Sequence, residues 1–291
     1  MKMNFRYFFR VLCAFAVLFM LMSCSSLRSK PGDIFALRIQ AEEGLESANK
    51  EAAKGNFEIA LNLLTGFKRN AILADDPSLI IRLCLSRGNV LFSLGRTEEA
   101  FAEWDQAIAE AQRFGNNELL SVSRIFKGRG NLLSGRVGAQ SVLDEVNRES
   151  ANVRSNKLYV AFTWQVRALA LRSLGSYRDA ENAARRSLDI HERDKRLENA
   201  SYDWYTIASI RSLAGNTNGA LQALESSIAI DRRIENSWGL ASSYRAMGDV
   251  YRRAGREREA IEEYQRARTI YTAMGNESEV AEINRRIRNS E

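Results

Sequence analysis

The feature that most constrains the fold is a glycine that recurs every 40 residues. It is accompanied by small residues seven positions earlier, and in five of the six units by Ala five positions later. Self-similarity at a period of this length indicates a repeat architecture, in which each unit packs against its neighbours along the chain. The recurring glycines are Gly55, Gly95, Gly135, Gly175, Gly215 and Gly255.

Each period predicts two helices joined at the glycine. A glycine can end a helix in the left-handed conformation without steric cost. Only 2 Pro occur in 291 residues, so few helix interruptions are present. Small residues let the two helices of a unit cross closely, and larger residues fill the space around them. We expect Leu64, Trp104, Leu224 and Tyr264, nine positions after their glycines, to fill it. The fold class predicted is all-α.

The sixth unit resembles the tetratricopeptide (TPR) repeat. The residues that carry the resemblance are Tyr244, Met247, Gly248, Tyr251, Gly255, Ala260, Tyr264 and Ala267. It extends over about residues 41–280, with a period longer than the ~34 residues usual in the family. It implies an α-solenoid of six helix-turn-helix units over residues 34–276, followed by a capping helix and tail in residues 277–291. Longer helices or longer turns must absorb the extra residues.

The third unit departs from the pattern. Gln140, Asp144 and Asn147 stand where apolar or small residues are expected. Moving the second helix one residue earlier places Ala139, Leu143 and Val146 on one face instead. We therefore expect a register shift after Gly135 and a bend in the solenoid at this unit.

The N-terminus predicts a secretion signal over residues 1–23. It has Lys2, Arg6 and Arg10, no acid, and an apolar run of the length usual for a signal peptide. Leu21-Met22-Ser23-Cys24 resembles the lipobox of bacterial lipoproteins. This implies acylation of Cys24, palmitate included, followed by a tether over residues 24–33. Ser25 implies sorting to the outer membrane, facing the periplasm. The alternative is an uncleaved anchor helix with a coincidental cysteine.

The charge of the chain does not favour a nucleic-acid partner. The formal net charge is +6, and three of the basic residues lie in residues 1–23, which contain no acid. Without that segment the chain carries +3. The basic cluster around Arg252 and Arg256 is interleaved with acids, as on an ordinary solvated helix. Electrostatic binding of phosphates requires a larger excess of positive charge.

The sequence provides little for catalysis. One His and three Cys leave almost nothing for a metal site or a nucleophile–histidine pair. His191 is flanked by charges and is expected to be solvated. Cys84 is expected to be a buried thiol. We therefore predict that the chain is not an enzyme and has no cofactor and no metal.

The resemblance also implies a binding groove lined by the first helix of each unit. Asparagine in such a groove can hold a peptide backbone, and arginine suits carboxylates. Leu45 and Leu85 stand where the family's carboxylate clamp has lysine, so that ligand is not expected. The groove residues implied are Asn49, Asn89, Phe92, Arg129, Gln165, Arg172, Tyr205, Ser209, Arg245, Asp249 and Arg252.

These features favour a membrane-anchored periplasmic scaffold that binds a protein or peptide partner. The end repeats could also mediate self-association. The alternative is an accessory subunit of a solute-uptake system, which docks a solute-binding protein or encloses a small ligand. A closed apolar pore would favour the alternative, and an open groove with exposed Tyr and Arg would favour the scaffold. An enzyme would need a convergent pair of buried carboxylates.

Overall fold

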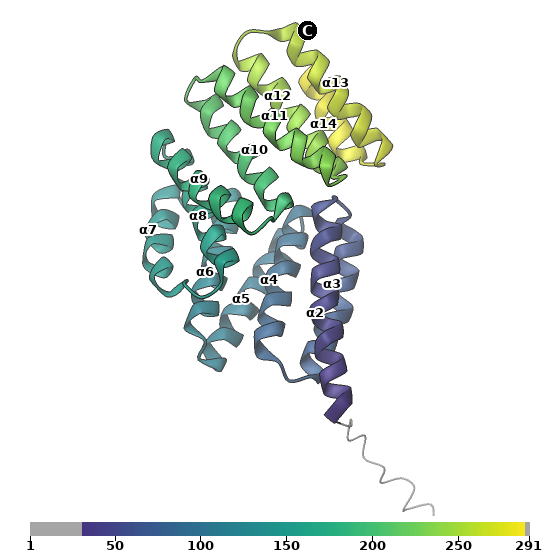
Figure 1. Ribbon diagram of the computed structural model, residues 1–291, viewed down its shortest axis with the longest axis vertical. Helices are drawn as coiled ribbons and strands as arrows, with labels where there is room; N and C mark the ends of the chain where they lie inside the picture. The colour runs from purple at the N-terminus through teal and green to yellow at the C-terminus, as the bar shows by residue number, and fades with distance from the viewer. Residues whose placement is uncertain (1–30, 289–291) are drawn as a thin grey trace, which may run out of the picture.

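The computed structural model describes residues 31–288, and every regular element in that range is a helix (Figure 1). The predicted all-α fold is therefore confirmed. Cys24, the lipobox and the predicted signal lie outside the described residues. The elements are α2 (Pro31–Ala53), α3 (Phe57–Leu73), α4 (Pro77–Ser93), α5 (Thr97–Phe114), α6 (Asn117–Leu133), α7 (Ala139–Glu149), the short 3₁₀ helix η1 (Ser150–Asn152), α8 (Lys157–Ser173), α9 (Tyr177–Arg193), α10 (Leu197–Leu213), α11 (Thr217–Arg233), α12 (Ser237–Arg253), α13 (Glu257–Ala273) and α14 (Glu277–Arg288).

Helix length explains the 40-residue period. In the fourth unit α8 and α9 each have 17 residues, and short turns at 174–176 and 194–196 separate them from their neighbours. The extra residues relative to a shorter TPR unit therefore lie in the helices. Within each unit the glycine of the turn has a positive φ, between 70° and 84° in the six recurring positions. Left-handed residues also occur between units, where Asp75, Lys195 and Glu235 replace glycine.

Side chains at the turns help to start the helices. Asp76 accepts a hydrogen bond from the backbone N–H of Leu79 at 3.0 Å, and Asn116 accepts one from Leu119 at 2.9 Å. Such caps satisfy N–H groups that have no partner inside the helix. They are one reason why several units begin a new helix after so short a turn.

Small and large residues pack between the helices as predicted. Trp104 of α5 is 1% exposed, and its indole lies against Gly88 of α4 and Gly130 of α6. A Cβ at either glycine would stand 2.2 Å from the ring. Leu64, Leu224 and Tyr264 are fully buried. The close approach of helices at glycine thus makes room for one large side chain.

The third unit has a register shift, but in the direction opposite to the predicted one. Helix α7 begins at Ala139, four residues after Gly135, whereas α9 begins two residues after Gly175. The buried positions of α7 are Val142, Val146 and Glu149, and the predicted Ala139 and Leu143 are only half-buried.

Helix α7 has only 11 residues, and Val146 is buried while Gln140, Asp144 and Asn147 are exposed. A shorter second helix followed by η1 replaces the ordinary 17-residue helix here. Its buried face is built mainly on Val142 and Val146.

The buried apolar residues form two clusters that divide within α8. The first runs from Ala41 to Val166, and the second from Ala168 to Ile287. We call the segments that carry them the N-terminal half and the C-terminal half. The path curves so that α2 and α3 come next to the last units (Figure 1). Phe57 and Trp238 touch there, with ring centroids 5.3 Å apart.

Candidate functional site

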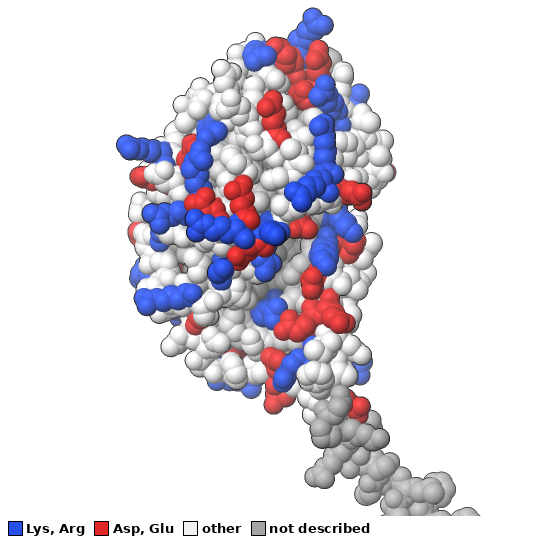
Figure 2. All heavy atoms as spheres, viewed as in Figure 1, with Lys and Arg blue, Asp and Glu red and all other residues white. Residues whose placement is uncertain are grey.

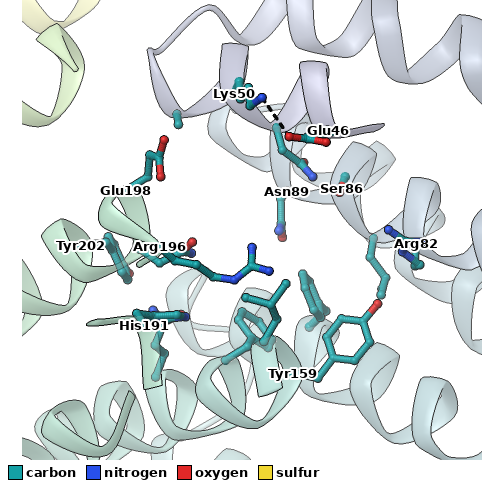
Figure 3. Close-up of a pocket in the computed structure, with 18 of the residues that line it drawn as sticks. Glu46, Lys50, Arg82, Ser86, Asn89, Tyr159, His191, Arg196, Glu198 and Tyr202 are labelled. Atoms are coloured by element: carbon teal, nitrogen blue, oxygen red, sulfur yellow. Dashed lines mark ion pairs between the residues drawn. The ribbon is translucent and has the colours of Figure 1, made fainter. Parts of the chain in front are cut away.

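A cavity of about 750 Å³ lies on the inner side of the curve (Figure 3). Its walls are the first helices α2, α4, α6, α8 and α10 together with the turn between α9 and α10. We call it the central pocket. Figure 2 shows a hollow near the middle of this face, with basic and acidic side chains around it. Its volume lies within the range of small-molecule and peptide pockets.

Four of the predicted groove residues line the central pocket. Asn49, Asn89 and Arg129 occupy the same repeat position on α2, α4 and α6, and Gln165 comes from α8. The 40-residue spacing places the first three in a row along the inner wall. Arg129 Nη1 lies 3.5 Å from the side-chain oxygen of Asn89. The sequence pattern thus brings these four residues to one surface.

The other predicted groove residues do not line this pocket. Phe92 is half-buried against Trp104, with centroids 5.8 Å apart, and Arg172 donates to Ser209 at 3.1 Å. Tyr205 lies beside Tyr202, at 6.4 Å between ring centroids. Phe92 is thus engaged within the N-terminal half, and Arg172 and Tyr205 have neighbours on the C-terminal half or on the rim of the pocket.

Three predicted groove residues of the sixth unit hold the end of the solenoid together. Arg245 pairs with Glu279 of α14 at 2.6 Å, and Asp249 accepts the hydroxyl of Tyr264 at 2.7 Å. Arg252 lies 3.7 Å from Asp249, which also pairs with Arg286 at 2.5 Å. These contacts bind α12 to α13 and α14. These three side chains therefore stabilise the end of the solenoid.

The cationic side chains of the central pocket differ in their partners. Arg82 pairs with Glu42 at 2.6 Å, and Lys50 pairs with Glu46 at 2.8 Å. Among residues 31–288, Arg129 and Arg196 have no carboxylate within the 4.0 Å of a salt bridge. In Figure 3 the Arg196 guanidinium extends into the pocket toward Asn89. Two guanidinium groups from different walls are therefore available to an anionic ligand.

Aromatic side chains form much of the remaining wall. Phe126 and Phe162 stack with centroids 4.0 Å apart, and Tyr159 and Tyr202 also line the pocket. Burial raises the pKa of the Tyr159 hydroxyl above its ordinary value, so this group stays protonated and can donate a hydrogen bond. The pocket thus joins apolar rings to hydrogen-bond donors.

Arg196 was missed at the sequence level because only first-helix positions were considered. It precedes α10, in the turn between two units, and comes to the pocket because the solenoid curves. No local signal distinguishes it from the other charges in the HERDKR segment. Tyr159 and Tyr202 were missed too, although both lie on first helices.

The prediction for His191 was wrong. Its side chain is 1% exposed, and Nδ1 lies 2.6 Å from Oδ2 of Asp203, which is also buried. Ser187 donates to both carboxylate oxygens of Asp203 at 3.1 and 3.0 Å, and Gln165 Nε2 donates at 2.7 Å. The repeat register would have indicated this, because the equivalent positions Ala71, Ala111, Asp231 and Tyr271 are also fully buried.

The prediction for Cys84 is confirmed. Its side chain is fully buried in the core of the N-terminal half. Burial raises the pKa of the thiol to about 11, which keeps it in the unreactive protonated form at neutral pH.

Residues 31–288 contain neither a cluster of metal ligands nor a membrane-spanning helix. No group of three or more His, Cys, Asp or Glu side chains in that range is placed to hold a metal ion. Within the same range, every helix is too short or too polar to cross a bilayer.

Comparison with known proteins agrees with the fold. Residues 200–273 match the family model described as "Tetratricopeptide repeat". No curated protein matches the sequence.

Solved structures with a similar path are distant in sequence. A Rap protein complexed with competence and sporulation factor has TM-score 0.59 and 13% identity, covering 100% of this chain and 88% of that one. BtubC (BKLC) from P. vanneervenii has TM-score 0.54 and 16% identity, covering 82% and 92%. Aspartyl phosphate phosphatase F from Bacillus subtilis has TM-score 0.51 and 10% identity, covering 100% and 85%. At these identities the likeness concerns the fold, and the described chain is an all-α solenoid of TPR-like helix-turn-helix units.

Proposed function

We propose that this protein is a scaffold that holds an acidic segment of a protein or peptide partner in the central pocket. The observation that carries the proposal is the pair of guanidinium groups, Arg129 and Arg196, that line the pocket with no carboxylate of the described residues in salt-bridge range. Guanidinium binds carboxylate in a bidentate geometry. A partner carboxylate would supply the missing anion.

The rest of the pocket suits an extended chain. The amides of Asn49 and Asn89 can hydrogen-bond a peptide backbone, since each offers a donor and an acceptor. The stacked rings of Phe126 and Phe162 provide apolar surface for a side chain next to the acid. The Rap structure was solved in complex with a factor, which supports a binding role for this architecture.

We also propose that the scaffold is anchored to a membrane through acyl groups on Cys24, on the periplasmic side of the outer membrane. The lipobox-like Leu21–Cys24 segment and the basic, apolar stretch before it support this. Several acyl chains anchor a domain stably, whereas one chain binds only marginally. Binding, without catalysis, is the role proposed for the folded part.

A second function is favoured by the size and shape of the pocket. A cavity of about 750 Å³ bounded by five helices has room for a small carboxylate. The protein would then be an accessory subunit of solute uptake. Both functions share the same chemistry, an anionic carboxyl group held by Arg129 and Arg196.

Fluorescence anisotropy with the full chain tests the proposal. The probe is a fluorescein-labelled acidic peptide of Asp, Glu and Leu with a free C-terminus, and its uncharged Asn/Gln analogue serves as reference. We expect the acidic peptide alone to bind, and R129E or R196E to weaken it at least tenfold, about 1.4 kcal/mol. The matched control is Arg69→Glu, because Arg69 is exposed on α3 and outside the pocket.

Three outcomes of this assay are informative. Equal binding of both peptides, or equal loss in Arg69→Glu, would contradict the proposed recognition. Competition by free succinate or glutamate at the peptide's own affinity would favour the solute-binding function. Competition only by acidic peptides would favour the scaffold.

A further inference from the structure

The first and last units of the solenoid touch each other. The turn between α2 and α3 approaches the start of α12 and the end of α13, through Gly55, Phe57, Trp238 and Met274. We call these four residues the closing contact. Phe57 and Trp238 meet edge to face, with planes at 83°, and Trp238 meets Tyr271 in the same way at 5.5 Å.

Glycine is required for this approach. Gly55 has φ +84°, and a Cβ there would stand 2.7 Å from the Trp238 ring and 3.3 Å from the Met274 methyl. The recurring glycine therefore serves a second purpose in the first unit. It ends α2, and its lack of a side chain admits the indole of a unit far along the chain.

The closing contact does not belong to a continuous core. Phe57 is half-buried against the apolar cluster of the N-terminal half, whereas Trp238 and Met274 pack against that of the C-terminal half. The two clusters separate within α8, between Val166 and Ala168. Apolar packing between the halves is thus concentrated at two places: around α8, where the chain passes from one half to the other, and at the closing contact.

The central pocket lies between these two places. Its walls α2, α4 and α6 belong to the N-terminal half, and the turn before α10 belongs to the C-terminal half. Opposite charges face each other across it. Glu46 interacts with Arg196, and Lys50 interacts with Glu198, in addition to the Glu46–Lys50 pair at 2.8 Å (Figure 3). These exposed charges are solvated and hold the halves together only weakly.

We propose that the two halves open and close about α8, that the closing contact is the point at which they part, and that this opening widens the central pocket, which already opens to solvent as the hollow seen in Figure 2. A few half-buried aromatic contacts and solvated charges are weaker than the buried clusters on either side, so the contact opens before either cluster does. The narrow pocket suits a small ligand, and the widened pocket admits a segment of a larger partner. The widening of the pocket rests on the proposed function, but the motion itself does not.

Distances between labels on the two halves test the motion. Spin labels are placed at two exposed positions, N62C on α3 and T269C on α13. The full chain used for this carries Cys13→Ser and Cys24→Ser, so that neither of these cysteines is labelled. Cys84 is kept, because it is buried. Phe57→Asp removes the closing contact and puts an acid in the first turn of α3, where it is tolerated. Phe114→Asp is the matched control, because Phe114 is an exposed ring outside the closing contact.

We expect Phe57→Asp to move the distance distribution to longer values and Phe114→Asp to leave it unchanged. A distribution unchanged by Phe57→Asp would overturn the motion. If the circular dichroism spectrum shows that the Phe57→Asp protein has lost its helices, Phe57→Ala is measured in its place. A shift to longer distances then supports the motion, and an unchanged distribution overturns it. Because no ligand is used, this experiment tests the motion even if the proposed function is wrong.

The rate of labelling inside the pocket tests the widening. A cysteine at N89C in the pocket, in the chain with Cys13→Ser, Cys24→Ser and the buried Cys84, is labelled with a polyethylene-glycol maleimide. N62C on the outer surface serves as reference. We expect Phe57→Asp to speed labelling of N89C several-fold and to leave N62C unchanged. Longer label distances without faster labelling of N89C would overturn the proposal that parting at the closing contact widens the pocket.

Discussion

The Nδ1 atom of His191 lies 2.6 Å from Oδ2 of Asp203, and both side chains are within 1% of complete burial. The pair connects α9 to α10, and Gln165 of α8 completes it at 2.7 Å. A buried ionisable pair is costly to break, because the group left behind has no solvent to replace its partner. This pair therefore concerns the stability of the fourth and fifth units more than catalysis.

The first prediction follows from that pair. Asp203→Ala leaves the hydrogen-bonding groups of His191, Ser187 and Gln165 without their shared acceptor. We expect it to lower the free energy of unfolding by about 3–5 kcal/mol, measured by urea denaturation followed by circular dichroism. Asp189→Ala, an exposed acid on the same helix α9, should have little effect. If both variants lowered the free energy of unfolding by an equally small amount, the structural role of the pair would be contradicted.

The second prediction concerns Asp231, at the position equivalent to His191 in the next unit. Its Oδ2 atom is buried without a hydrogen-bond partner, and burial raises the pKa of the carboxyl above its ordinary value of 3.8. The charged carboxylate of Asp231 therefore lowers the stability of the folded protein. This loss of stability develops as pH rises from 3.8, the ordinary pKa, through the raised pKa of the folded state. Asp231→Asn should stabilise the protein by about 1–3 kcal/mol at pH 7.

The pH dependence is the sharper check of this second prediction. At a pH below 3.8 the carboxyl is protonated in both states, so the gain of Asp231→Asn should vanish there. Thermal melts of both proteins across this range measure it. A gain of the same size at every pH would mean that the asparagine acts through packing and not through charge.

The third prediction tests the packing of Trp104 between two glycines. Gly88→Ala places a methyl 2.2 Å from the indole and should cost about 1–3 kcal/mol of stability through overpacking. Gly66→Ala is the matched control, because Gly66 lies in helix α3 with no atom within 4 Å of the added methyl. It should stabilise by up to about 1 kcal/mol. Thermal unfolding of both variants should therefore shift in opposite directions; a shift in the same direction would contradict this packing.

The fourth prediction concerns the proposed lipid anchor. Cys24→Ala should abolish labelling by radioactive palmitate and release the protein from membranes into the soluble fraction. Cys84→Ala is the control, because that thiol is buried and should have no part in acylation. Full membrane retention of the Cys24→Ala protein would show that something other than the acyl groups holds it.

Local sequence pattern predicted the parts of the fold that each unit determines for itself. The glycine period predicted the helix pairs, and Trp104 was correctly predicted to fill the space beside the small residue Gly88. Its contact with Gly130 of the next unit was not predicted. A shifted helix in the third unit was predicted, but the direction of the shift was wrong, because Val142 is buried and Leu143 only half-buried. These features depend on neighbours within about one period.

The pocket depended on contacts that no single unit specifies. Arg196 reaches it from a turn only because the solenoid curves, and Phe57 meets Trp238 across five units. His191 was misassigned for the opposite reason. Its charged neighbours in the sequence point outward, while its repeat position faces the adjacent unit, where Asp203 provides the partner.

Site-specific photocrosslinking tests the central claim most directly. Benzoylphenylalanine at Tyr202, which lines the central pocket, is compared with the same group at Phe114, exposed outside it, in cells that produce the full chain. The account predicts a protein or peptide adduct from position 202 that disappears in Arg129→Glu and does not form from position 114. No adduct at 202, or an equal adduct at 114, would contradict binding of the partner in the central pocket.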